Sequence, residues 1–120
     1  MNIEISSVAE KQNLEKERII LRVTADTDVG SFALLQTGFS GDEVTIGVHQ
    51  TYWFPYKRVE AGDLVVLYTK KGTQNENTLK SGKKAHFFYW GLSAAIWGKS
   101  DRAPVLLYAP EWESKRPDEL

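Results

Sequence analysis

Apolar residues recur at every second position along most of this chain, which is the spacing of β-strands that bury one face. Turn-forming residues separate these segments at intervals of about a dozen positions. Seven strand-like segments can be delimited, at residues 3–5, 18–24, 32–35, 44–49, 64–68, 86–90 and 105–108. Their number and spacing predict an all-β fold, an antiparallel β-sandwich of about seven short strands.

Helical signals are weak: residues 92–97 could form a single turn, and the longer candidate is residues 8–16. This stretch holds good helix formers, but only Val8, Ala9 and Leu14 are apolar, so it has no continuous face to bury. We therefore expect an exposed turn or loop there.

The longest segment without a strand pattern is residues 70–84. Its polar composition, with Gly72 and Gly82, predicts a long flexible loop between two strands. Long loops often carry function, so this segment is a first place to look for a binding site.

The composition is that of one ordinary globular domain. Of 120 residues, 15 are Lys or Arg and 16 are Asp or Glu, so the formal net charge is -1. We expect a single domain over residues 1–110 and a charged, flexible tail over 111–120. The absence of cysteine excludes a disulfide scaffold, thiol catalysis and cysteine-based metal sites.

Nothing in the sequence predicts a membrane partner. No apolar run approaches the roughly 20 residues that cross a bilayer, and the N-terminal residues lack the features of a signal peptide. A cytoplasmic location is therefore the expectation.

One block of residues points to a known family. Tyr52-Trp53-Phe54-Pro55, followed by Ala61-Gly62 and the valine-rich segment 64–68, resembles the lamin tail domain family. Further segments fit it in order, at residues 3–8, 18–21, 28–34 and 97–107. Phe32 stands where the family usually has tryptophan, and Thr24-Ala25-Asp26 replaces its usual asparagine.

The resemblance, which covers roughly residues 3 to 109, implies an immunoglobulin-like β-sandwich. In that family the domain is a non-enzymatic interaction module, so it implies contact with a protein partner or with a second copy. It implies no catalytic residue, no cofactor and no small-molecule substrate. Pro55 should lie at a strand start or edge, and Trp53 and Phe54 should cap one end of the core.

Candidate catalytic and metal motifs are all incomplete. His49 and His86 could face each other across two strands, but no third metal ligand stands at motif spacing. Asp26 and Asp28 precede Gly30 as in the opening of a calcium loop, but no glutamate closes it. We therefore expect no metal and no enzymatic activity.

The best binding candidate is the basic loop with the aromatic strand that follows it. The predicted site residues are Lys70, Lys71, Lys80, Lys83, Lys84, Phe87 and Tyr89. Alternation places His86, Phe88 and Trp90 on one side of the strand and Phe87 and Tyr89 on the other. One of these sets is then exposed or packs against another chain.

Two functions compete for this surface. The first is a protein-binding or self-associating module. The alternative is a nucleic-acid-binding β-domain, in which lysines contact phosphates and rings stack on bases. The near-zero net charge argues against a domain-wide attraction to nucleic acid and leaves only a local patch.

Overall fold

The computed structural model describes residues 1–120. Strands hold 49% of the chain and helix only 5%, so the all-β prediction is confirmed. No helix is long and apolar enough to cross a membrane. The ten strands are β1 (Ile3–Ala9), β2 (Arg18–Val23), β3 (Thr27–Asp28), β4 (Phe32–Ser40), β5 (Glu43–Trp53), β6 (Arg58–Val59), β7 (Leu64–Tyr68), β8 (Asn75–Thr78), β9 (Lys84–Tyr89) and β10 (Arg102–Tyr108). Two short 3-10 helices complete them, η1 (Val29–Ser31) and η2 (Pro117–Glu119).

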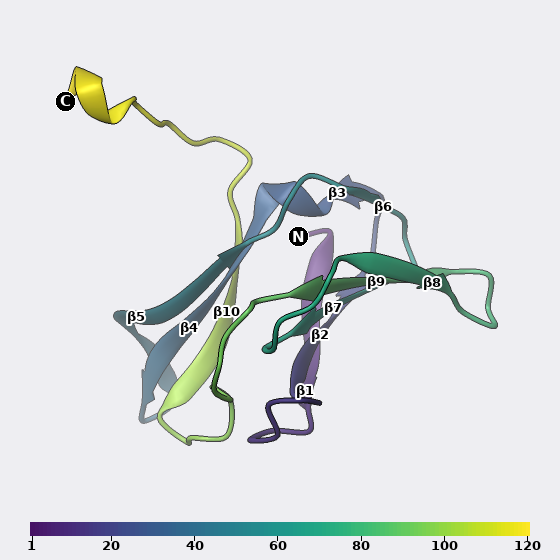
Figure 1. The fold of residues 1–120 in the computed structure, drawn as a ribbon, viewed down its shortest axis with the longest axis horizontal. Helices are drawn as coiled ribbons and strands as arrows, with labels where there is room; N and C mark the ends of the chain where they lie inside the picture. Colours follow the sequence, from purple (N-terminus) through teal and green to yellow (C-terminus); the bar gives the residue numbers. More distant parts are fainter.

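The strands form a sandwich of two sheets. One sheet has the order β1-β2-β7-β9-β8, the other has the order β10-β4-β5, and the short pair β3-β6 lies at one end (Figure 1). The two-residue alternation turns one side of each sheet inward. The core therefore collects side chains from both sheets: Ile3, Ile19, Leu21, Val23, Val29, Phe32, Leu34, Phe54, Val59, Val65, Leu67, Phe88, Trp97 and Leu106.

Residues 70–84 are not one long loop. Within them, Asn75–Thr78 form β8, which pairs with β9 as an antiparallel hairpin at the edge of the five-stranded sheet. The loop prediction was wrong for these residues. All four are exposed, so β8 lacks the apolar alternation by which a strand is predicted from sequence.

One strand pair departs from the predicted antiparallel arrangement. β7 and β9 are parallel, with Leu64 opposite Ala85 and Tyr68 opposite Tyr89. This happens because β9 lies between β7 and β8, although β8 comes first in the sequence. The β8–β9 hairpin thus presents its second strand to β7.

Strand β5 is longer than predicted and is irregular. Its pairing with β4 shifts register between Gln36 and Thr37 and again between Thr37 and Phe39. Ile46, within this irregular part, is fully exposed. Such bulges disrupt the hydrogen-bond ladder and discourage edge-to-edge pairing with other chains.

The aromatic block after β5 is placed only partly as predicted. Phe54 is buried and packs edge-on against Phe88, with ring centroids 5.2 Å apart, so it does join the two sheets. Trp53 is 52% exposed and points away from the core, because it is the neighbour of an inward residue on the same strand. Pro55 lies in the strand-free segment between β5 and β6 and starts neither.

The loop between β1 and β2 is a turn, not a helix, and it is held by a buried carboxylate. Glu17 is fully buried. Its Oε1 accepts hydrogen bonds from the backbone N–H of Gln12 (2.9 Å) and Trp97 (3.0 Å). Its Oε2 accepts from Ile96 N–H (2.9 Å) and from the Thr69 hydroxyl (2.6 Å). One side chain thus joins three segments that are distant in sequence.

The C-terminal segment leaves the sandwich after one contact, between the rings of Trp112 and Trp53. Every residue from 110 onward is exposed, and Figure 1 shows this segment running away from both sheets to end in η2.

Candidate functional site

The fold divides the predicted basic loop into two groups. Lys70 and Lys71 follow the end of β7, whereas Lys83 and Lys84 lie where β9 begins. Because β7 and β9 run parallel, these two pairs lie at opposite ends of the sheet. Lys80 is exposed in the hairpin turn, beyond the start of β9. The five lysines therefore form no single patch.

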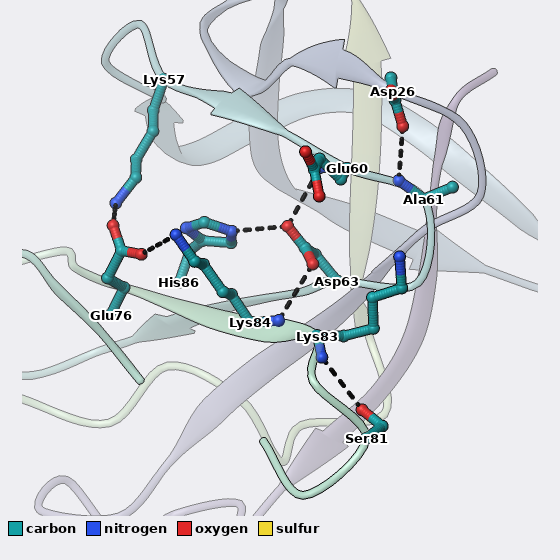
Figure 2. A network of polar contacts seen from close by, with 10 residues as sticks. All are labelled: Asp26, Lys57, Glu60, Ala61, Asp63, Glu76, Ser81, Lys83, Lys84 and His86. Atoms are coloured by element: carbon teal, nitrogen blue, oxygen red, sulfur yellow. Dashed lines mark hydrogen bonds and ion pairs between the residues drawn. The ribbon is translucent and has the colours of Figure 1, made fainter. Parts of the chain in front are cut away.

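Lys84 is part of an ion-pair network (Figure 2). Glu76 lies between Lys57, whose Nζ is 2.7 Å from Oε1, and Lys84, whose Nζ is 3.0 Å from Oε2. The hydrogen bonds from Lys57 and Lys84 lower the pKa of Glu76 to about 2. The hydrogen bond to Glu76 in turn raises the pKa of Lys84. Glu76 therefore offsets part of the charge that the predicted site would offer a phosphate.

Beside this network lies a buried pair, Asp63 and His86 (Figure 2). Asp63 Oδ2 is 2.8 Å from His86 Nε2 and accepts a 3.0 Å bond from Glu60 N–H, while Oδ1 accepts one from Lys84 N–H. Burial acts to raise the pKa of Asp63, but the hydrogen bonds outweigh it and the pKa is lowered. The pair is closed to solvent, and it fastens the start of β9 to the turn before β7.

Lys83 has a packing role in the same region. Its aliphatic stem lies against Gly62, where a Cβ would come within 3.0 Å of Lys83 Cε. Gly62 also has φ +94, as expected for a glycine in a tight turn. The exposed ammonium group of Lys83 forms no ion pair.

The two predicted aromatic residues belong to a different surface, on the outer side of the five-stranded sheet. Here Tyr68 stacks on Tyr89, with centroids 5.4 Å apart and planes 10° apart, and Phe87 lies 6.3 Å from Tyr68. Arg18 and Lys70 lie over the Tyr68 ring, at 5.8 Å and 5.1 Å from its centroid. We call these five residues the aromatic platform.

The register of the sheet builds this platform. Arg18 is opposite Tyr68, and Tyr68 is opposite Tyr89, so three side chains from β2, β7 and β9 form one row on the outer face. A Cβ on Gly72 would come within 2.2 Å of the Tyr89 ring, so only glycine leaves room for it there. All three rings are half-buried. The alternation predicted for residues 86–90 is confirmed, since His86 and Phe88 are buried.

A second surface is the outer side of the three-stranded sheet. Two rows of paired residues cross it, and none of the six side chains is charged: Leu107, Ala33 and Trp53, then Val105, Leu35 and Thr51. We call this the outward apolar face. Leu107 is 42% exposed, and Trp53 meets Trp112 of the tail edge-on at 5.1 Å. Contiguous exposed apolar residues can mark an interaction site.

Sequence reasoning missed Arg18, Tyr68 and the whole outward apolar face. Arg18 and Tyr68 could be connected to Tyr89 only through strand register, which the sequence does not state. The outward apolar face had a local signal: residues 32–35 are all apolar, which is more than a strand with one buried face requires.

No group of three or more His, Asp or Glu side chains is arranged to hold a metal ion. A scan against models of known protein families finds no match for this chain, and a search of curated proteins finds none.

Proposed function

We propose that this chain is a non-enzymatic interaction module, similar to a lamin tail domain, that self-associates through its outward apolar face. The resemblance is supported by two features of the quoted block. Phe54 is a core residue, and the Ala61-Gly62 turn leads directly into β7.

The observation that carries the proposal is the chemistry of the outward apolar face. In a sandwich whose outer side faces water, outward positions normally carry polar or charged residues. Here both rows lack any charge, and Leu107 and Trp53 are well exposed. Covering such a surface removes apolar area from water, at roughly 25 cal/mol per Å².

A second copy of the chain is the occupant that the charge pattern favours. When a charged surface pairs with the same surface of a second copy, like charges meet and their repulsion costs free energy. The outward apolar face has no charge to repel or to bury unpaired, so two copies can stack by a two-fold axis. The bulge in β5 disfavours pairing of two copies through that one sheet edge.

Sedimentation velocity at protein concentrations from about 1 μM to 1 mM tests this proposal. We expect a monomer–dimer equilibrium that Leu107→Lys shifts to monomer. Ile5→Lys is the matched control, because Ile5 is 37% exposed on the other sheet, and it should leave the equilibrium unchanged. A monomer throughout the range, or equal effects of both variants with circular dichroism unchanged, overturns the proposal.

Single-stranded nucleic acid binding is the second candidate, and the aromatic platform favours it. Half-buried stacked rings beside two cations are the elements with which proteins hold bases and phosphates. The candidate site is now Arg18, Tyr68, Lys70, Phe87 and Tyr89, without Lys83 and Lys84.

Fluorescence anisotropy with a labelled oligothymidylate tests this second candidate. Tyr89→Ala should weaken binding by about tenfold, since a stacked base contributes roughly 1–3 kcal/mol. Tyr108→Ala, an exposed tyrosine on the other sheet, should have no effect. With two cations on phosphates, log affinity should fall with log salt at a slope of about −1.4. Equal loss in both tyrosine variants would exclude the platform.

A further inference from the structure

A cleft opens at the end of the sandwich, on neither of the surfaces described above. It has a volume of about 310 Å³. Its walls come from the β1–β2 loop (Gln12), β4 (Gln36), β5 (His49 and Gln50), the segment between β9 and β10 (Lys99) and the start of β10 (Arg102). These elements meet at the lower end of the molecule in Figure 1. We call this cavity the end cleft.

The polar lining of the end cleft consists of two cationic groups, one imidazole and three amides. Lys99 and Arg102 face it together with His49 and three glutamine side chains, and no aspartate or glutamate lines it. A neighbouring cavity of about 320 Å³ shares Lys99 and Arg102, adds Lys11, and also lacks an acidic lining residue. Lys11, Lys99 and Arg102 thus lie near one another, while the acidic groups nearby are Asp101, which pairs with Arg102, and the Glu17 carboxylate behind the wall.

Part of that positive charge is free of ion pairs. Lys11 and Lys99 are exposed and have no acidic partner, whereas Arg102 Nη1 lies 3.1 Å from Asp101 Oδ2. Guanidinium and ammonium groups, with amide N–H donors beside them, form strong charge-assisted hydrogen bonds to carboxylate or phosphate oxygens. The lining therefore suits an anion rather than a cation or an apolar ligand.

The wall of the end cleft is held in place by buried contacts. Glu17 accepts hydrogen bonds from the backbone of Gln12, Ile96 and Trp97, all three of which line the cavity. Gln36, which is buried, donates through Nε2 to the carbonyl of Ile96. These contacts fix the backbone of the cleft wall before any ligand binds.

Two local costs occur at the same place. Gln12 has φ +71, a left-handed conformation that non-glycine residues rarely adopt and that clusters at functional sites; Glu10, outside the cavity lining, has φ +53 in the same loop. Trp97 is buried and lines both cavities, and its indole Nε1 has no acceptor in the protein. A buried donor without a partner is uncommon and calls for an explanation. A ligand oxygen would supply the missing acceptor after a small movement of the cleft wall.

From these observations we infer that the end cleft binds a small organic molecule that carries an oxyanion, either a carboxylate or a phosphate. Its volume is at the lower limit of about 300 Å³ for small-molecule sites, which restricts the ligand to metabolite size. The apolar side chains of Ala95 and Ile96 would contact the rest of the ligand. This site does not depend on the proposed self-association.

Two-dimensional ¹H–¹⁵N NMR titration with phenyl phosphate and, separately, benzoate tests the inference, and inorganic phosphate serves as the ring-free comparison. We expect saturable shifts at the Trp97 indole and at residues 95–102. The stronger of the two aromatic probes identifies the oxyanion. Lys99→Gln and Arg102→Gln should each weaken binding by about tenfold, the effect of one charge-assisted hydrogen bond.

Lys80→Gln is the matched control, because it removes one exposed lysine from the distant hairpin turn. It should leave the affinity unchanged. Lys99 is exposed, so Lys99→Gln should fold even if a change at Arg102 in β10 does not. The inference is overturned if no probe binds with a dissociation constant below about 10 mM. It is also overturned if Lys80→Gln weakens binding as much as Lys99→Gln.

Discussion

The hydroxyl of Thr69 donates a 2.6 Å hydrogen bond to Glu17 across 52 residues of sequence, and both residues are fully buried. A second bond, from Thr69 N–H to the Glu17 carbonyl (3.2 Å), runs beside it. This contact joins the end of β7 to the end of the β1–β2 loop. The same carboxylate fixes the segment that carries Trp97, so the core and the end cleft share one polar anchor.

Replacing Glu17 should therefore be costly. Glu17→Gln puts an NH₂ group among four donors. An NH₂ at the Oε2 position leaves Ile96 N–H without an acceptor, and one at the Oε1 position leaves both Gln12 N–H and Trp97 N–H without one, in a buried site. We expect the free energy of unfolding, measured in urea, to fall by about 2–4 kcal/mol. Glu15→Gln is the control, because that side chain is exposed, and it should change stability by less than about 0.5 kcal/mol.

A double-mutant cycle with Thr69→Val would separate the pair from the rest of the cluster. We expect a coupling energy of about 1 kcal/mol between Glu17→Gln and Thr69→Val, as for residues of one hydrogen-bond network. Strict additivity would show that Thr69 contributes nothing through this bond.

Acid should destabilise the protein in part through Asp63. The pKa of Asp63 is lowered in the folded protein from its ordinary value of 3.8. A carboxyl group of this kind contributes stability above its unfolded pKa and loses that contribution as pH falls through the folded pKa. We expect the free energy of unfolding to fall below about pH 4, and Asp63→Asn to make that fall shallower while lowering stability at neutral pH. Parallel pH profiles for the two proteins would contradict this role.

Glu76 should titrate at an unusually low pH. Its hydrogen bonds with Lys57 and Lys84 lower its pKa from 4.5 to about 2. In Lys57→Met the larger of these two contributions is lost, so we expect the pKa of Glu76 to rise toward 4.5. Carboxyl-carbon NMR measures this directly. Lys71→Met is the control, because Lys71 makes no contact with Glu76, and it should leave the titration unchanged.

Gly30 should tolerate no side chain. A Cβ there would come within 2.7 Å of Tyr56 Cα and 2.9 Å of its backbone nitrogen, and backbone cannot rotate away. We expect Gly30→Ala to lower the free energy of unfolding by about 1–3 kcal/mol. Gly47→Ala, whose nearest neighbour would be 3.7 Å away, should be neutral or slightly stabilising in thermal melts. A similar loss in both variants would show that the Gly30–Tyr56 contact is not the cause.

How far the sequence could predict this fold depended on whether each strand buries one face. β2, β4, β7 and β9 each bury apolar residues in the core, and their apolar residues, alternating or in a continuous run, marked them. β8 buries nothing, so it was invisible. The parallel pairing of β7 and β9 could not be predicted, because an apolar pattern records which side is buried and not which strand lies alongside.

The candidate sites were harder to predict for the same reason. Lys70 and Lys84 are only 14 positions apart in sequence, yet the crossing of the chain through β8 places them at opposite ends of the sheet. Glu17 was one charge in a polar stretch, and only its distant donors Thr69 and Trp97 reveal that it is buried. The end cleft combines residues from five segments, so no local sequence motif could predict it.

The insertion of β9 between β7 and β8 also governs how the molecule must assemble. During synthesis β7 emerges before the strand that will occupy its free side, and β8 emerges with no neighbour to join. The edge of β7 that will pair with β9 therefore has no partner until at least 16 further residues have been synthesised, because Ala85 is the first residue of β9 that pairs with it. Val65 and Leu67 lie within this strand. The pairing of β9 with β7 is a non-local contact of the kind that slows the folding of β-proteins. Until it forms, the nascent chain exposes an unpaired, aggregation-prone strand edge.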